Sequence, residues 1–265
     1  MKIREKTWLW GLNPGADHYG DENGLVGYNR MTPFEGAYYF GTKNLIRAER
    51  FGYPKAPLDG EAERFDSLDK TVWTIDPKKP ETIDEVIRIA KYHKNIKGAI
   101  IHTDVEMYEF IGPDISLIAE ARKKIKEALG EDFEIWIQFY GIVVEVLKAA
   151  ITPYYELADV ICFFNRGAIE IHDLDKYLDT IYRYGGKEKK IVFGAYFWDF
   201  QMKCMMSPGS IRCCLDKYSE WMKTGKIDGM VLYSNTLADI NLAAAFEAKK
   251  WMEEHGDEEI GEVAR

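Results

Sequence analysis

Residues 97–103 read KGAIIHT, and residues 133–140, after an amphipathic stretch, read FEIWIQFY. Both runs are short and rich in β-branched and aromatic residues, which is typical of buried strands. The stretch between them, residues 115–129, has apolar residues at helical spacing and is followed by Gly130, a common residue just past a helix end. Together the three segments predict a strand, a crossover helix and a second, parallel strand.

The same alternation continues in both directions along the chain. Eight strand-like runs repeated with helical stretches between them have one common solution, a closed (β/α)8 barrel, and we expect residues 1–265 to form a single TIM-barrel domain. An open doubly wound sheet is the alternative, but the turn after the first strand, NPGAD at 13–17, lacks the glycine-rich pattern of that fold. The expected strands are 7–12, 44–51, 71–75, 97–103, 133–140, 159–165, 190–197 and 229–234.

Capping patterns and periodicity also predict the helices. Thr32, Pro33 and Glu35 form a capping box with proline at the first helical position, and Pro80 opens another helix. The remaining helices are expected at 61–68, 115–129, 143–157, 174–184, 211–224 and 237–255.

Composition limits the classes of partner. The 265 residues carry a net charge of −9, which argues against nucleic acid. No apolar run reaches the roughly 18 residues of a membrane helix, and no signal peptide is apparent, so we expect a cytoplasmic protein, or a secreted one if a leader precedes this sequence. The four cysteines include no CxxC pair and predict neither a zinc site nor another cofactor. These patterns do not determine the oligomeric state.

The carboxyl ends of barrel strands carry the functional groups of such folds. In this chain those ends combine carboxylates, amides and large aromatic rings. Aromatic faces cover the C–H faces of sugars, and polar groups bind their hydroxyls, so the mixture indicates a small-molecule or oligosaccharide substrate. The candidate substrate-binding residues are Trp10, Glu49, Trp73, Asp76, His102, Trp136, Gln138, Tyr140, Asn165, Tyr196, Trp198 and Asn235.

Three carboxyl groups are candidates for catalysis. Glycoside hydrolysis requires one protonated carboxyl group and one ionised carboxylate. Asp104 and Glu106 follow the fourth strand and Asp199 follows the seventh, on the opposite side of a barrel mouth. Asp104 or Glu106 is therefore the predicted proton donor and Asp199 the predicted nucleophile or base.

Several of these runs resemble a family. The run IKGAIIHTDV at 96–105 resembles the "G-hydrophobic-DDF" strand of a poorly characterised group of bacterial glycoside-hydrolase-like TIM barrels. Residues 133–140 and ADVICFF at 158–164 look like that group's fifth and sixth strands. IVFGAYFWDF at 191–200 is similar to its "G-x-Y-x-W/Y-D" seventh strand, and residues 225–251 also fit. The resemblance covers about residues 95–256 and implies a barrel that acts on carbohydrate.

The chain departs from that group at one position. Thr103-Asp104 stands where the group has two acids, so a pair that works jointly would be incomplete here. A fainter resemblance links Asp104-Val105-Glu106 to the terminal D-x-E of chitinase-type family 18 barrels, in which the glutamate is the acid. The upstream aspartates of that motif fall on Ala99 and His102.

Two other functions remain open. Metal-dependent barrel isomerases and lyases also place acids and histidine at strand ends, and Glu49, Asp76, His102, Asp104 and Asp199 are the candidate ligands. A barrel that binds sugar without cleaving it is the second alternative, supported by the missing acid. A Schiff-base aldolase is disfavoured because no lysine lies near the carboxyl end of an expected strand.

Overall fold

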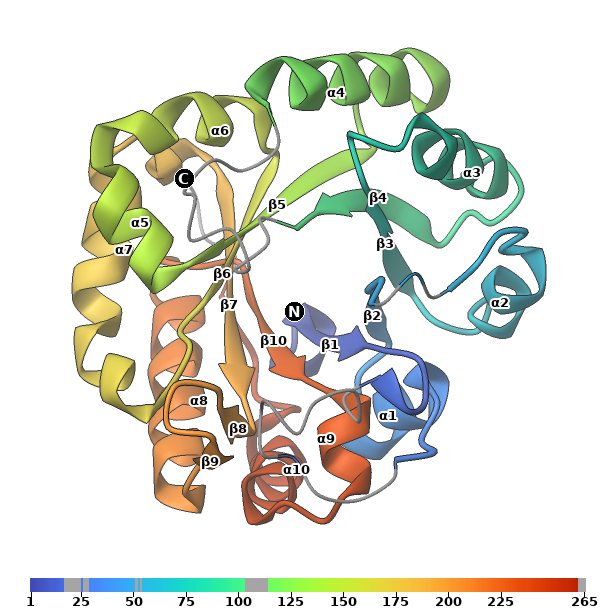
Figure 1. Ribbon diagram of the computed structural model, residues 1–265. Helices are drawn as coiled ribbons and strands as arrows, with labels where there is room; N and C mark the ends of the chain where they lie inside the picture. The colour runs from blue at the N-terminus through green and yellow to red at the C-terminus, as the bar shows by residue number, and fades with distance from the viewer. Residues whose placement is uncertain (17–24, 26–28, 51, 53, 103–113, 262–265) are drawn as a thin grey trace.

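The structure is a closed barrel of eight parallel strands surrounded by helices (Figure 1). It is a computed structural model that describes residues 1–16, 25, 29–50, 52, 54–102 and 114–261. Neighbouring strands follow the order β1-β10-β7-β6-β5-β4-β3-β2, and β2 pairs with β1 to close the ring. The predicted (β/α)8 barrel is confirmed. The barrel strands are β1 (Thr7–Gly11), β2 (Asn44–Arg47), β3 (Lys70–Ile75), β4 (Ile96–Ile101), β5 (Glu134–Tyr140), β6 (Val160–Phe164), β7 (Lys190–Tyr196) and β10 (Gly229–Tyr233).

Helices connect successive strands and cover the outside of the barrel. The α-helices are α1 (Pro33–Phe40), α2 (Asp59–Arg64), α3 (Pro80–Ala90), α4 (Ile115–Leu129), α5 (Gly141–Leu147), α6 (Thr152–Leu157), α7 (Leu174–Arg183), α8 (Pro208–Lys223), α9 (Asn235–Asp239) and α10 (Ala243–His255). Short 3-10 turns are η1 (Ile3–Lys6), η4 (Lys148–Ile151), η5 (Ala168–Asp173) and η6 (Gly186–Glu188), and a hairpin of β8 (Trp198–Asp199) and β9 (Cys204–Met205) follows β7.

Local sequence signals account for most helix boundaries. The Thr32 hydroxyl accepts a hydrogen bond from the Glu35 amide, and the Glu35 carboxylate binds back to the Thr32 amide, as the capping box predicts. Helix α4 ends at Gly130, whose φ of 94° lies in the left-handed region.

Two predicted helices are interrupted. The stretch 143–157 divides because Lys148 has a φ of 47°, and a new helix starts at Thr152 with Pro153 in its first turn, where the missing amide hydrogen is tolerated. The stretch 237–255 divides at Asn241, whose φ is 59°. Both breaks come from single residues with positive φ, which the apolar periodicity does not reveal. The β8–β9 hairpin was not predicted.

The barrel interior is filled with aromatic side chains. Alternate residues of each strand point inward, so rings from strands that are not neighbours meet across the barrel. The Trp8 ring of β1 lies 4.8 Å from the Trp136 ring of β5. Phe164 on β6 extends over Gly194 on β7, and a Cβ atom at Gly194 would lie 1.9 Å from the Phe164 ring. Gly194 is therefore required to make room for that ring.

We expect Gly194→Ala to lower the free energy of unfolding by about 1–3 kcal/mol, because the added methyl group must displace Phe164 in a filled interior. Urea denaturation would measure the change. Gly60→Ala on α2 is the matched control, since a Cβ there meets no atom within 4 Å. Equal stability of Gly194→Ala and the wild type would contradict the proposed packing role of Gly194.

Candidate active site

A cluster of inward-facing rings lies at the carboxyl ends of the barrel strands, which form the mouth of the barrel, and Trp10, Phe164, Tyr196 and Tyr233 in this cluster are at most 5% exposed. The Trp10 ring of β1 lies 5.0 Å from His102 after β4 and 5.3 Å from Phe164 of β6, and neither strand is a neighbour of β1. Trp10 also stacks on Tyr233 of β10 at 5.8 Å, and Tyr233 lies 4.5 Å from Tyr196 of β7. We call these five residues the mouth cluster.

Polar atoms border this cluster. Arg50, after β2, donates from Nη1 to the Tyr233 hydroxyl at 2.9 Å. Tyr140, at the end of β5, forms a side-chain hydrogen bond with Tyr196, and burial raises the pKa of Tyr196 well above its usual value. The mouth therefore combines aromatic faces with a guanidinium group and phenolic hydroxyls drawn from opposite sides of the barrel.

His102 is held in one orientation by Thr74 on β3. The distance from His102 Nε2 to Thr74 Oγ1 is 3.1 Å. Thr74 Oγ1 also lies 3.2 Å from the Arg47 carbonyl oxygen and accepts from the Glu49 amide at 3.0 Å. A hydroxyl group donates only once, so if Thr74 donates to Arg47, His102 must donate from Nε2 and keep Nδ1 as an acceptor. In this arrangement the Thr74 hydroxyl has three hydrogen-bond partners, Arg47, Glu49 and His102.

The imidazole is neutral over most of the pH range. Burial, with a further contribution from the positive charge of Arg50, lowers the pKa of His102 to about 4, and Asp76 opposes the shift. A neutral imidazole can accept a hydrogen bond from a substrate hydroxyl, which a protonated one cannot.

Glu49 and Asp76 lie at the rim, where both are half-buried. The Glu49 carboxylate accepts from the Gly52 amide. The Asp76 carboxylate accepts from the Lys78 amide at 2.9 Å and pairs with Lys79 Nζ at 3.2 Å. Both acids are thus tied to their own loops but remain beside the mouth.

Trp136 and Gln138 lie deeper in the barrel, on the same face of β5 as Tyr140. Both are buried, and the Trp136 indole donates to Glu134 Oε2 at 3.0 Å. Trp136 lies two inward positions below the strand end. It therefore packs in the filled interior, against Trp8 at 4.8 Å.

Trp73 was predicted to bind substrate, and the structure places its ring away from the mouth cluster. Its ring lies 5.8 Å from Phe65, and its indole donates to Thr71 Oγ1 at 3.0 Å. Trp73 alternates with the inward-facing Val72 and Thr74, so strand parity directs it outward, between the barrel and the segment after α2.

Asn165 and Asn235 were predicted to bind hydroxyl groups of the substrate, but each binds the protein itself. Asn165 accepts from the Tyr218 hydroxyl of α8 at 3.3 Å and donates to the Gly167 carbonyl at 3.2 Å. The fully buried Asn235 accepts from the Leu12 amide and donates to the carbonyls of Leu12 and Met31. These side chains fix loops behind the mouth.

Asp199 is buried and its carboxylate binds three backbone amides. Oδ2 accepts from Ala168 at 2.8 Å, and Oδ1 accepts from Gln201 at 2.9 Å and from Met202 at 2.8 Å. The neighbouring Trp198 is also buried, where β8 pairs with β9. The carboxylate of Asp199 therefore joins the β8–β9 hairpin to the loop after β6.

The two remaining catalytic candidates, Asp104 and Glu106, lie outside the described residues. Phe200 is a mouth residue that the sequence reasoning missed, and Arg50 stood at a strand end without being selected. The signal for Phe200 was present, because it closes the aromatic run of residues 196–200. Its ring lies 4.9 Å from Tyr196 and 6.0 Å from Tyr233.

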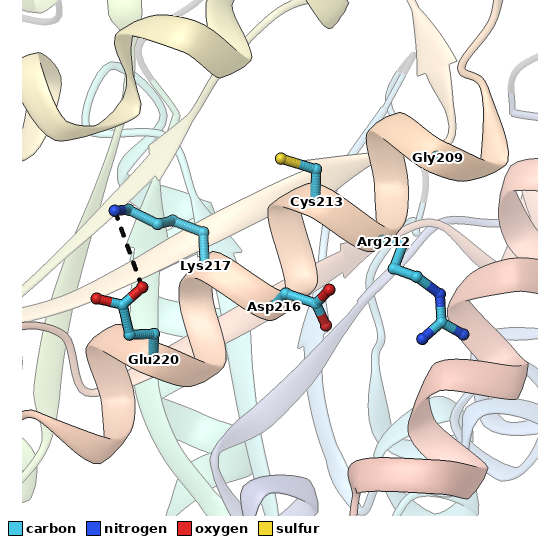
Figure 2. A pocket seen from close by; sticks show the side chains of 6 residues that line it. All are labelled: Gly209, Arg212, Cys213, Asp216, Lys217 and Glu220. Atoms are coloured by element: carbon cyan, nitrogen blue, oxygen red, sulfur yellow. Dashed lines mark ion pairs between the residues drawn. The ribbon is translucent and has the colours of Figure 1, made fainter.

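A shallow hollow of about 500 Å³ lies away from the mouth, on the outer face of α8 (Figure 2). Lys217 reaches toward Glu220 along the same helix, at 4.0 Å. The hollow is lined by Gly209, Arg212, Cys213, Asp216, Lys217 and Glu220. Since a single helix supplies all of these residues, the hollow lacks the convergent groups of the mouth.

The described part of the chain contains no group of three or more His, Cys, Asp or Glu side chains arranged to hold a metal ion. In the same residues, no helix combines the length and the apolar character needed to cross a bilayer.

Comparison with known proteins identifies the fold. No family model and no curated protein sequence matches the chain. Among solved structures, a "putative alpha-L-fucosidase" from Bacteroides thetaiotaomicron is similar, with a TM-score of 0.61, 11% identity and coverage of 97% of this chain and 98% of that chain. A glycoside hydrolase family 18 N-acetylglucosaminidase from Paenibacillus barengoltzii has a TM-score of 0.56 at 11% identity, covering 93% and 99%.

A third similar structure is the N-terminal domain of a "putative aldolase" from Bacteroides vulgatus, with a TM-score of 0.56, 12% identity and coverage of 96% and 81%. These likenesses show that the chain shares the barrel fold of glycoside hydrolases, as the sequence resemblance implied. Because one neighbour is described as an aldolase, the choice of chemistry depends on the residues of the mouth.

The lowered pKa of His102 predicts how the free energy of unfolding depends on pH. The unfolded state takes up a proton at His102 near the ordinary pKa of 6.5, whereas the folded state does so only at about 4. Stability from this group is thus complete above pH 6.5 and is lost as the pH falls toward 4. Urea denaturation from pH 7 to 4 would measure how stability falls with acid, and we expect His102→Gln to abolish up to about 3 kcal/mol of that fall.

The exposed His172, changed to Gln, is the control, and its pH profile should follow that of the wild type. If the His102→Gln profile also ran parallel to the wild type, the imidazole would not be shielded.

Proposed function

We propose that this chain is a carbohydrate-processing enzyme of the glycoside-hydrolase type, with its substrate in the barrel mouth. The observation that carries the proposal is the mouth cluster, in which Trp10, Tyr196 and Tyr233 meet from three strands beside the Arg50 guanidinium. Aromatic faces with a few convergent polar groups are the usual composition of a sugar site.

The acid–base chemistry in this proposal belongs to Asp104 or Glu106. Asp104 follows His102 by two residues in the sequence, and His102 contacts Trp10 in the mouth cluster. A carboxyl group at such a position can donate a proton to a glycosidic oxygen.

His102 has a different part in the same proposal. Its neutral ring accepts a hydrogen bond from a sugar hydroxyl and orients the sugar without competing for the catalytic proton. Arg50 donates to further hydroxyl oxygens, and Trp10 covers a C–H face of the sugar. Each of these functions uses a group whose position at the mouth is fixed by a neighbour, namely Thr74 for His102 and Tyr233 for Arg50.

The direct test is turnover of p-nitrophenyl glycosides, including the α-L-fucoside and the N-acetyl-β-D-glucosaminide, together with natural oligosaccharides followed by chromatography. We expect hydrolysis of at least one glycoside, and we expect it to persist after treatment with EDTA. Loss of activity with EDTA would favour the metal-dependent alternative. Sugar binding without turnover of any member would identify a non-catalytic binding barrel.

We expect Asp104→Asn to lower kcat/KM about 10²- to 10⁴-fold, because an amide cannot donate the required proton. The melting temperature should stay within about 2 °C of the wild-type value, since Asn has nearly the same volume as Asp and most single substitutions change stability only modestly. Glu106→Gln belongs in the same series, and Asp132→Asn, at an exposed position, is the control. Full activity of both Asp104→Asn and Glu106→Gln would disprove the assignment.

A further inference from the structure

The hairpin after β7 is attached to the loop after β6 by two buried carboxyl groups. Asp199 accepts three amide hydrogen bonds, one from Ala168 of that loop and two from the hairpin. Glu170 accepts from the Arg166 amide at 2.8 Å and from the Gln201 side chain. We call this set of contacts the hairpin strap.

The strap depends on a close approach at Gly167. A Cβ atom at Gly167 would lie 2.5 Å from Asp199 Oδ1, so only glycine lets the loop come this close. One backbone bond, from the Phe200 amide to the Arg166 carbonyl at 3.2 Å, completes the attachment. The strap therefore fixes the backbone on both sides of Phe200.

Phe200 is the residue that this attachment presents to the mouth. Its half-buried ring packs edge-on against Tyr196 at 4.9 Å and against Tyr233 at 6.0 Å. The same Tyr233 receives the hydrogen bond from Arg50. Phe200 thus extends the mouth cluster outward, over the ends of β7 and β10.

We propose that Phe200 is a substrate-contacting residue that forms one wall of the sugar site, and that Asp199 is a positioning residue which acts through Phe200. The inference rests on the proposed function and adds an outer subsite to it. The ligand at this wall is the apolar face of a sugar ring, or an aromatic aglycone, bound next to the sugar that undergoes cleavage. Asp199 in this account neither attacks the substrate nor transfers a proton.

The first experiment tests the strap without any sugar. Hydrogen exchange followed by mass spectrometry reports on the amides of Ala168, Gln201 and Met202, which bind Asp199 in the structure. Asp199→Asn replaces one acceptor oxygen by an NH2 group, so we expect exchange to accelerate at least tenfold either at Ala168 or at Gln201 and Met202. Asp228→Asn is the matched control, because its carboxylate accepts the Ile191 amide at the opposite end of β7. Unchanged exchange rates in Asp199→Asn would contradict the proposal that Asp199 attaches the hairpin to the loop after β6.

The second experiment tests the wall. We expect Phe200→Ala to raise KM about three- to tenfold for the p-nitrophenyl glycoside that the wild type hydrolyses, with kcat within twofold. Phe200→Tyr, which keeps the ring, should restore the wild-type KM. Phe246→Ala, on the exposed face of α10, makes the same change away from the mouth and should have no effect. A KM equal to that of the wild type in Phe200→Ala would contradict the proposal that Phe200 contacts the substrate.

The third experiment joins the two residues in a double-mutant cycle. If Asp199 acts through Phe200, Asp199→Asn raises KM in the wild-type background and has little further effect in Phe200→Ala. If Asp199 were the nucleophile or base, Asp199→Asn would instead lower kcat by orders of magnitude in both backgrounds, which would overturn the positioning role. If Asp199→Asn fails to fold, Gln201→Ala can replace it in the cycle. This substitution removes only the hydrogen bond from the Gln201 side chain to Glu170 and so weakens the hairpin strap less.

The results separate the two proposals. Turnover by the wild type with an unaltered KM in Phe200→Ala would disprove the wall and leave the proposed function intact. Absence of both turnover and sugar binding in the wild type would disprove the proposed function and the substrate contact together. The exchange experiment would still decide whether Asp199 holds the hairpin.

Discussion

The alternation of side chains along a closed ring of strands is the constraint on which the rest of this structure depends. Because every second residue points inward, Trp10, Phe164, Tyr196 and Tyr233 converge although they lie more than 200 residues apart at the extremes. The convergence also needs room, which the missing side chain of Gly194 provides for Phe164. Strand parity and one glycine thereby place four aromatic rings at one end of the barrel.

The fold could be predicted from the sequence more completely than the site. All eight barrel strands were predicted, because apolar runs bounded by turn residues are a local signal. The sequence did not predict which side chains of each strand point inward. A shift of one residue in the strand register exchanges the inward-facing and outward-facing side chains. Trp73 shows the consequence: it stands at a strand end like Trp10 but faces the helices. The contacts of Asn165 and Asn235 within the protein could not be predicted for another reason, since their partners, Tyr218 and Leu12, are distant in sequence.

The electrostatics of the mouth follow from the same packing. The rings around His102 leave it only partly exposed to water, and partial loss of hydration disfavours the charged imidazole. Arg50 adds to this effect, whereas Asp76 opposes it from the rim. Thr74 holds the ring by a hydrogen bond that does not require the charge. A neutral, oriented acceptor among aromatic faces is consistent with recognition of hydroxyl groups and needs no residue beyond those that already build the barrel.

The carboxylates of this chain show why residue type and strand position do not establish a catalytic role. Asp159 and Asp228 precede strands, and each accepts an amide from the neighbouring strand, Ile135 and Ile191 respectively. At the other end of the barrel, the Asp199 carboxylate also accepts backbone amides, three of them, which belong to loops. An aspartate beside a strand can therefore either bind backbone amides and fix the chain or face a substrate. Its hydrogen-bond partners show whether it does the first. The three backbone amides that Asp199 accepts show that its carboxylate fixes a loop, and this role is present whether or not the residue also takes part in chemistry.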